Sequence, residues 1–233
     1  MINSKSVLTI IPARGGSKRL SRKNVLPLSG KPIISWTINA ALKSKYIDNI
    51  VVSSDDDEII DISLNASVIA IKRPQELSAD DTPTISVVKH ILSEIENNYS
   101  HVLLLQPTSP LRDHHDIDQS FELLIKKAGD AIISVCEVDH SPLLSNTLPP
   151  DGSLNQFIPN EVKNKRTQDL PKYYRINGAI YICKTDRLIK ENTFFLKDNI
   201  YSYVMDKRKS VDIDDIFDYE FAQFLINSQY LIR

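Results

Sequence analysis

Residues 6–24 read SVLTIIPARGGSKRLSRKN, an apolar run that passes directly into a basic loop with two adjacent glycines. The run at 6–12 is rich in β-branched residues and predicts a strand buried on both faces. Helical and strand-like patterns then alternate as far as residue 135. Such alternation is typical of βαβ units around a mainly parallel sheet. The sequence therefore predicts an α/β fold with its ligand-binding residues in the loops that follow the strands.

The remaining elements are predicted from the same patterns. Strands are expected at 50–53, 68–71, 101–106, 130–135, 178–183 and 200–205, with a further extended run at 210–213. Helices are expected at 31–45, from 55, from 83 to 97, at 116–127 and at 216–228. Between 139 and 175 the periodicity stops and prolines accumulate. A loop of this length is uncommon inside a compact domain, so we expect an excursion such as a β-arm or an oligomerisation flap within one domain over 1–233.

Composition restricts the class of protein. Of 233 residues, 42% are hydrophobic and 25% are charged, which is ordinary for a globular protein and excludes disorder as the main state. The net charge of −2 does not indicate general nucleic-acid binding. No apolar run approaches the length of a membrane span, and the first residues do not resemble a signal peptide. Cys136 and Cys183 lie in strand-like runs, so free thiols and a reducing cytoplasm are expected.

The basic loop is a candidate phosphate site. Five cations lie between Arg14 and Lys23, whereas the first acidic residue of the chain is Asp48. Adjacent glycines at 15 and 16 let backbone approach a phosphate closely, and an arginine fork or a lysine can neutralise its oxygens. The order of residues fits neither a Walker A loop nor GxGxxG. The pattern therefore favours a polyphosphate ligand, although charge alone would also fit a solvated basic surface.

Two acidic groups are candidate metal ligands. In an extended segment Asp212 and Asp214 would point to one side, and paired carboxylates suit Mg²⁺ bound to a substrate phosphate. Asp215 would face away and could cap the following helix. A second acidic run at 55–57 stands at a predicted helix start, where capping is the better interpretation. No GxSxG motif and no zinc spacing of histidines occurs, so nucleophilic and zinc chemistry have little support.

Six segments together resemble the N-acylneuraminate cytidylyltransferase family, also called CMP-sialic acid synthetases. In chain order they are IIPARGGSKRLSRKN, VVSSDDDEI, RPQELSADDTPT, LLLQPTSPLR, INGAIYI and MDKRKSVDIDD. The resemblance implies a Rossmann-like nucleotidyltransferase fold, a three-layer sandwich, and a homodimer built through residues 139–175. It also implies a reaction in which CTP and an α-keto acid sugar of nine carbons give a CMP-sugar and pyrophosphate, with Mg²⁺ as cofactor.

The resemblance also implies roles for individual residues. Catalysis is assigned to Arg14, Lys18, Lys23 and Asp212. CTP binding is assigned to Ala13, Arg14, Ser17, Lys18, Asn24, Arg73 and Thr84. Sugar binding is assigned to Gln106, Arg166, Arg175, Asn177, Phe194 and Phe195, and in some members the partner subunit supplies the residue that matches Arg166. Asp212 and Asp214 match the metal-binding aspartates.

Two departures from the family pattern bear on the substrate. Leu144 follows the stretch HSPL at 140–143, where some sialic-acid-using relatives carry a lysine, and Arg19 stands where many relatives have glycine. The missing lysine leaves legionaminic acid or another bacterial nonulosonic acid open beside sialic acid. Three further alternatives are an eight-carbon octulosonate cytidylyltransferase, a glycosyltransferase with an Asp-x-Asp metal site and a sugar-nucleotide sensor.

Overall fold

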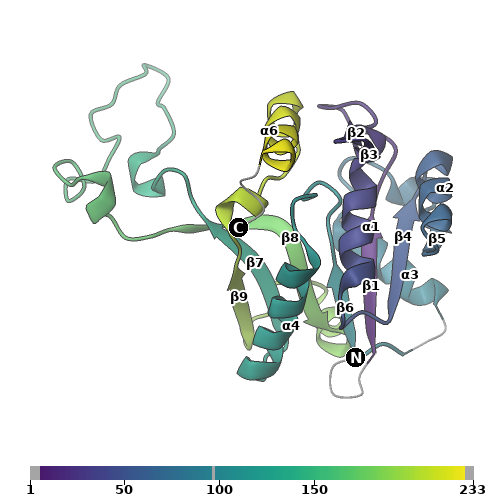
Figure 1. The fold of residues 1–233 in the computed structure, drawn as a ribbon. Helices are drawn as coiled ribbons and strands as arrows, with labels where there is room; N and C mark the ends of the chain where they lie inside the picture. The colour runs from purple at the N-terminus through teal and green to yellow at the C-terminus, as the bar shows by residue number, and fades with distance from the viewer. Residues whose placement is uncertain (1–5, 96–97, 229–233) are drawn as a thin grey trace.

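A seven-stranded sheet forms the centre of the computed structural model, which describes residues 6–95 and 98–228. The strand order across these described residues is β5-β4-β1-β6-β8-β7-β9 (Figure 1). The strands are β1 (Val7–Pro12), β4 (Asn49–Ser54), β5 (Ile69–Lys72), β6 (His101–Leu104), β7 (Ala131–Glu137), β8 (Tyr174–Lys184) and β9 (Ile200–Val204). Every strand expected between residues 6 and 205 is present, with bounds shifted by a few residues.

The sheet is mainly parallel, as the sequence predicts. β1 pairs in parallel with β4 on one side and with β6 on the other, and β4 pairs in parallel with β5. β8 alone runs antiparallel to both of its neighbours, β6 and β7, while β9 returns parallel to β7. The chain therefore reverses its direction of travel across the sheet between β1 and β6. In open α/β sheets the ligand binds at such a switch point, beyond the carboxyl ends of the strands.

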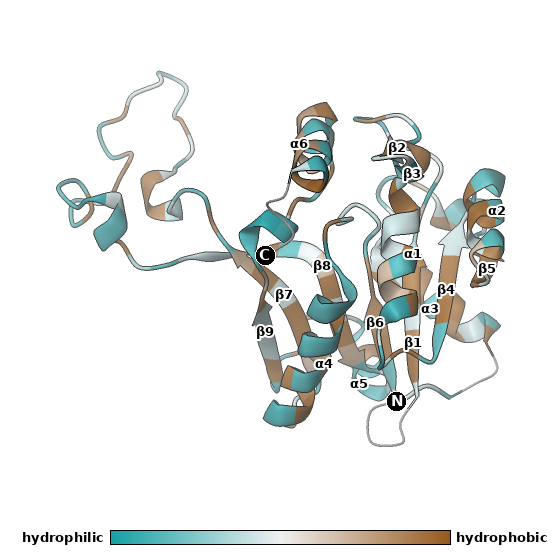
Figure 2. Ribbon diagram, viewed as in Figure 1, coloured by the Kyte–Doolittle hydropathy of each residue, from teal (hydrophilic) through white to brown (hydrophobic). Residues whose placement is uncertain are grey.

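Helices cover both faces of the sheet and complete three layers. α1 (Ile33–Lys43), α2 (Asp57–Asn65) and α4 (His114–Lys127) share one buried cluster with the strands. α3 (Thr84–Glu94) and α5 (Thr185–Glu191) pack into a second cluster on the opposite face. The strands between them are predominantly apolar (Figure 2). Burial on both faces explains why the strands read as continuous apolar runs in the sequence.

Some local expectations need correction. Residues 31–32 lie in β3 (Lys31–Pro32), which pairs with β2 (Pro27–Leu28), so the first helix starts at Ile33 rather than at 31. The short helix α5 has no counterpart in the expectations. Asn97, the expected end of the third helix, lies outside the described residues.

The segment at 210–213 is not a strand, because it pairs with no neighbour. The side chains of this segment nevertheless alternate between two sides. Val211 and Ile213 are buried in a third apolar cluster with α6 (Ile216–Asn227), whereas the alternate residues Asp212 and Asp214 line the cavity described below. The carbonyl of Thr108 holds this segment by accepting from the Ile213 N–H at 2.8 Å.

The chain between β7 and β8 leaves the body as a projecting arm (Figure 1). This arm, residues 138–173, contains only two short 3-10 turns, Pro142–Leu144 and Thr167–Asp169. Its roots are the ends of β7 and β8, which pair out to Glu137 and Tyr174. Among residues 6–95 and 98–228, every helix is too short or too polar to be a candidate membrane span.

Candidate functional site

A cavity of about 630 Å³ lies beyond the carboxyl ends of β1, β5 and β6. Its lining comes from the loops that follow these three strands and from the segment before α6. Ten of the residues proposed from the sequence line it: Arg14, Ser17, Lys18, Lys23, Asn24, Arg73, Thr84, Gln106, Asp212 and Asp214. Residues up to 200 positions apart in the chain are thus brought to one place, because parallel strands end at the same edge of the sheet.

The glycine loop after β1 is anchored by the start of α2. The Gly15 N–H donates to Asp55 Oδ1 at 2.9 Å, and a Cβ on Gly15 would lie 2.6 Å from Asp56 Oδ2. Only glycine fits this close approach. Asp56 also caps α2 by accepting from the Ile59 N–H, and Asp57 pairs with Lys72. The acidic run at 55–57 therefore serves capping and loop positioning, in agreement with the capping interpretation.

Acidic residues from distant parts of the chain neutralise the basic loop. Arg14 and Lys18 both pair with Asp80. Lys23 and Arg19 both pair with Asp214, at 3.1 and 3.0 Å. Arg22 pairs with Asp56 and Glu58 of α2. The positive charge of the basic loop lacks acidic partners only among its neighbours in the sequence. In the fold, each of its five cations pairs with a carboxylate.

Arg73 is buried at the end of β5, with 7% of its surface exposed. Its Nη2 donates to the Ser53 carbonyl at 2.8 Å and its Nε to the Ser53 hydroxyl at 3.1 Å. Burial lowers its pKa, and the Asp55 carboxylate opposes that shift. Arg73 therefore ties this part of the cavity wall to the end of β4.

Arg73→Ala is expected to lower the free energy of unfolding by about 1–3 kcal/mol, because it removes two buried hydrogen bonds to Ser53, one to the carbonyl and one to the hydroxyl. The neighbouring Lys72→Ala removes only a surface pair and should change stability by about 0.5 kcal/mol or less. Urea unfolding of the two variants against the parent protein measures both changes. Equal stability of Arg73→Ala and the parent would contradict the bracing role.

Asp212 and Asp214 lie together on the wall opposite Arg73, in a half-buried environment. Asp212 Oδ1 is buried and has no hydrogen-bond partner among the described residues. Burial raises the pKa of Asp212, and the nearby Asp214 carboxylate adds to this, while the Thr108 hydroxyl and Lys23 oppose it. A buried carboxylate oxygen without a partner needs an explanation, and a bound cation is one that fits a residue lining a polar cavity.

Lys23 connects the basic loop to this acidic pair. Its side chain is only 11% exposed, and its Nζ donates to the Ile213 carbonyl at 2.5 Å as well as to Asp214. Asn24 acts in the same way within the loop, because its Nδ2 donates to the Arg14 carbonyl at 2.9 Å. Its Oδ1 is buried without a hydrogen-bond partner in the described residues. The loop is thus held from both ends.

Gln106 follows β6 at the base of the cavity. A Cβ on Gly178, whose φ is +76°, would lie 3.1 Å from Gln106 Oε1 and 3.4 Å from Asp212 Oδ2. Glycine at 178 therefore makes room for both side chains and adopts a backbone conformation that other residues disfavour. The fully buried Arg112 fixes the same region by donating from Nη1 to the Ala179 carbonyl at 3.1 Å. Its burial lowers its pKa to about 10.

Three of the proposed residues support the cavity from behind. Ala13 is fully buried and its N–H donates to the Ser53 carbonyl. Asn177 is also buried, with Oδ1 accepting from Ser134 and Nδ2 donating to Ser210 Oγ at 2.9 Å. Arg175 is exposed and donates to the Ser210 carbonyl at 3.0 Å. Asn177 and Arg175 thus hold the segment that carries Asp212, and the Asn177 side chain does not line the cavity.

The two phenylalanines differ in exposure. Phe194 is 6% exposed and belongs to the core on the α3 and α5 face, whereas Phe195 is 52% exposed. Both rings lie against Tyr181, with centroids 5.8 and 6.3 Å away. The Asp212 charge contributes to the raised pKa of Tyr181, after burial. Tyr181 therefore packs against both phenylalanines and also feels the charge of Asp212. Neither phenylalanine lines the cavity.

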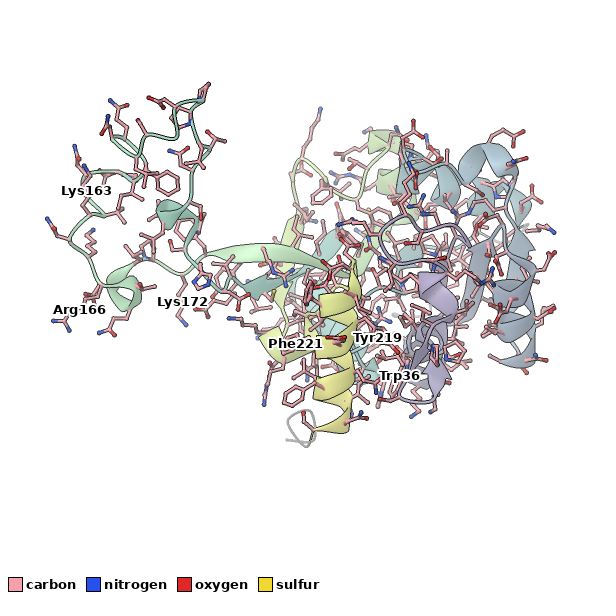
Figure 3. The ribbon with its side chains drawn as sticks, turned by 90° about the horizontal axis from the view of Figure 1, so that it is seen from above. Trp36, Lys163, Arg166, Lys172, Tyr219 and Phe221 are labelled. Carbon is pink, nitrogen blue, oxygen red and sulfur yellow. The ribbon has the colours of Figure 1, made fainter. Side chains whose placement is uncertain are left out.

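Arg166 lies on the projecting arm, away from the cavity of its own chain (Figure 3). The sequence alone does not place several other residues that do line the cavity, above all Asp80 and Thr108. Both lie in loops that follow strands, and this position marks the loops as ligand-facing. Within such a loop, an aspartate or a threonine is also an ordinary turn residue, so the sequence does not single out either one.

The model of one protein family, described as "Cytidylyltransferase", matches residues 8–229. The chain belongs to the cytidylyltransferase family. The match includes the basic loop, the arm and both aspartates before α6. Every residue that lines the cavity lies within the matched range.

Curated relatives narrow the comparison within this family. An N-acylneuraminate cytidylyltransferase of Streptococcus agalactiae serotype V is 39% identical over 89% of the chain and 50% of its own length. A pseudaminic acid cytidylyltransferase of Campylobacter jejuni is 35% identical over 94% of the chain and 95% of that protein. A CMP-N,N'-diacetyllegionaminic acid synthase of Legionella pneumophila is 32% identical over 97% of the chain and 99% of that protein. The chain spans about half the length of the N-acylneuraminate relatives it matches.

Solved structures agree on the fold. A CMP:2-keto-3-deoxy-manno-octonic acid synthetase complexed with CTP has a TM-score of 0.69 at 16% identity, covering 95% of this chain and 98% of that one. A 4-diphosphocytidyl-2C-methyl-D-erythritol synthase from Anaerococcus prevotii has a TM-score of 0.65 at 16% identity, with coverages of 96% and 99%. The expected Rossmann-like nucleotidyltransferase architecture is therefore confirmed.

Proposed function

We propose that this chain transfers CMP from CTP to a nonulosonic acid, an α-keto acid sugar of nine carbons, with release of pyrophosphate. The proposal rests on one observation. In a member of the cytidylyltransferase family, four of the five cations of the basic loop and the Asp212–Asp214 pair line one cavity at the switch point of the sheet. The experiment that tests it is release of pyrophosphate from CTP in the presence of such an acid.

The residues of the basic loop act on the triphosphate. Arg14, Lys18 and Lys23 neutralise its oxygens, and Ser17 and Asn24 add polar contacts. Arg73 and Thr84, with backbone near Ala13, form the cytosine and ribose end of the site. The anomeric hydroxyl of the sugar attacks the α-phosphorus, and pyrophosphate leaves on the opposite side. Cations near the leaving oxygens stabilise the charge that develops there, which is the main contribution a protein makes to such a transfer.

The acidic pair fits Mg²⁺. Asp212 offers a buried oxygen without a partner, Asp214 offers a second carboxylate, and hard oxygen ligands suit this ion. Among the described residues no group of three or more acidic, histidine or cysteine side chains is placed to hold a metal. Two carboxylates plus substrate phosphate is a usual set for Mg²⁺. When bound, the ion would neutralise phosphate charge and orient the phosphates.

Arg14→Ala is expected to raise the KM for CTP by about 10- to 100-fold, since a charge-assisted contact to phosphate is lost. The KM for the sugar should change by about threefold or less. Arg22→Ala is the matched control, because Arg22 belongs to the same loop but pairs with α2 and does not line the cavity. Initial-rate kinetics with each substrate varied in turn measure both constants. An equal rise in the two would argue against a phosphate role for Arg14.

Gln106 is the proposed sugar-binding residue that lines the cavity, and the acceptor end of the site is placed beside it. Arg175 and the aromatic group of Phe194, Phe195 and Tyr181 lie outside the lining, so direct contact of these residues with the sugar stays a prediction. The relatives aligned over most of the chain carry names with N-acylneuraminic, pseudaminic and legionaminic acids, which supports a nonulosonic acid as a class. The octulosonate alternative has less support. The solved synthetase for that eight-carbon acid is 16% identical to this chain, so the likeness shows only a shared fold. The two buried free cysteines support the reducing cytoplasm as the location.

We also propose that two copies pair through the arm, so that Arg166 of each reaches the sugar site of the other. The arm carries exposed Leu148 and Leu154, at 65% and 61% exposure. α6, beside the root of the arm, exposes Phe217 and Phe221 at 77% and 52% (Figure 3). Large apolar side chains exposed on two projecting elements are typical of surfaces that a partner covers. A second copy would cover it.

A further inference from the structure

Asp80 stands across the cavity from the basic loop, between the 3-10 turn at Gln75–Leu77 and α3. Its Oδ1 accepts from Arg14 Nη1 at 2.5 Å, and its Oδ2 pairs with Lys18 Nζ. These two cations hold the pKa of Asp80 below its ordinary value, so the carboxylate is charged at neutral pH. An anion of the protein itself therefore occupies the position where the proposed function requires phosphate oxygens.

Of the other acids that pair with the loop, Glu58 pairs with Arg22, which does not line the cavity, and the remaining two have further roles. Asp56 caps α2, and Asp214 belongs to the proposed Mg²⁺ pair. For Asp80, the polar contacts of its side chain in the described part of the chain are those with Arg14 and Lys18. The side chain is 40% exposed, and its loop contributes nothing to the three buried clusters. Asp80 can therefore be displaced without disturbing the core.

We propose that Asp80 is an internal counter-anion that competes with triphosphate and pyrophosphate for Arg14 and Lys18. This inference rests on the proposed function. In the free protein the carboxylate keeps two cations neutralised and in place. A phosphate between the same cations would face a like charge at close range, so CTP must displace Asp80 to bind. After transfer, the carboxylate returns to the cations and promotes the departure of pyrophosphate.

Asp80→Asn removes the competing charge with almost no change in shape. Asp81→Asn is the matched control, because it removes the same charge from the next residue, which does not line the cavity. The probes are CTP, inorganic pyrophosphate and inorganic tripolyphosphate, with binding measured by calorimetry in low and high salt. Asp80→Asn is expected to bind all three about 3- to 10-fold more tightly in low salt, which corresponds to the loss of one or two exposed ion pairs. The gain should shrink in high salt, where exposed charges are screened.

Stronger product inhibition by pyrophosphate in Asp80→Asn should accompany the tighter binding. Unchanged or weaker binding in Asp80→Asn overturns the inference, as does an equal gain in Asp81→Asn, which would reflect net charge alone. Turnover by the parent protein with no gain in Asp80→Asn overturns this inference and leaves the proposed function standing. Tighter tripolyphosphate binding by Asp80→Asn without any turnover of CTP by the parent supports this inference and overturns the proposed function. Absence of binding of all three probes to every variant would overturn both.

Discussion

Asp212→Asn is expected to reduce Mg²⁺-dependent turnover by at least about 100-fold while leaving the fold intact. Loss of one group that stabilises developing charge in a water-excluded site has an effect of this size. Asparagine keeps the shape but lacks the charge with which Asp212 and Asp214 together would hold the ion. The measurement is kcat over a Mg²⁺ titration. Unchanged activity would remove Asp212 from the metal site.

The same substitution should stabilise the protein. Asp212 is a partly buried carboxylate beside a second carboxylate, and burial already raises its pKa. Removing the charge relieves this cost, and a gain of about 1 kcal/mol would raise the Tm by roughly 2–4 °C for a chain of this size. Asp215→Asn is the control, because Asp215 caps α6 and asparagine is an equally good cap. It should leave both activity and Tm near the parent values. A lower Tm for Asp212→Asn would indicate that the carboxylate is structural.

Replacing residues 146–161 by a short Gly/Ser linker is expected to yield a monomer with little activity. The buried clusters take none of their described residues from this segment, so the body should still fold. Its removal takes away Leu148 and Leu154 and the support for Arg166. Light scattering measures the mass in solution, and circular dichroism checks the fold. A dimer of normal stability would exclude the arm as the interface.

A complementation experiment isolates the contribution of Arg166. Arg166→Ala should remain dimeric and lose about 10- to 100-fold in kcat/KM for the sugar, since an arginine contact to a carboxylate is lost. If Arg166 acts across the dimer, mixing it with Arg14→Ala subunits restores activity. Half of the randomly mixed dimers combine both variants, and each of these has one intact site of two. About a quarter of the parent activity should therefore return. No recovery on mixing would contradict a shared site.

The sequence was sufficient for the architecture because strand runs and helix periodicity are local signals. The β1 run and the loops after β1, β5 and β6 could be placed at one sheet edge from parallel topology alone. The pair Asp212–Asp214 was correctly placed on one side although the segment is not a strand, since Val211 and Ile213 are anchored in the core and impose the alternation.

Ion pairs between residues far apart in the chain could not be predicted from the sequence. Asp80, Asp214 and Glu58 lie at least 36 positions from the cations they neutralise, so the basic loop looked uncompensated. The family resemblance assigned Asn177 to sugar binding, which stays a prediction. Its buried amide donates to Ser210, a contact that only the folded chain reveals.

The most direct test of the account measures pyrophosphate released from CTP with Mg²⁺ and a panel of acids: N-acetylneuraminate, legionaminate, pseudaminate and the eight-carbon octulosonate. We expect release with one of the nine-carbon acids, lost when UTP replaces CTP or when a chelator removes Mg²⁺. No release with any nine-carbon acid, despite measurable binding of CTP, would contradict the proposed transfer.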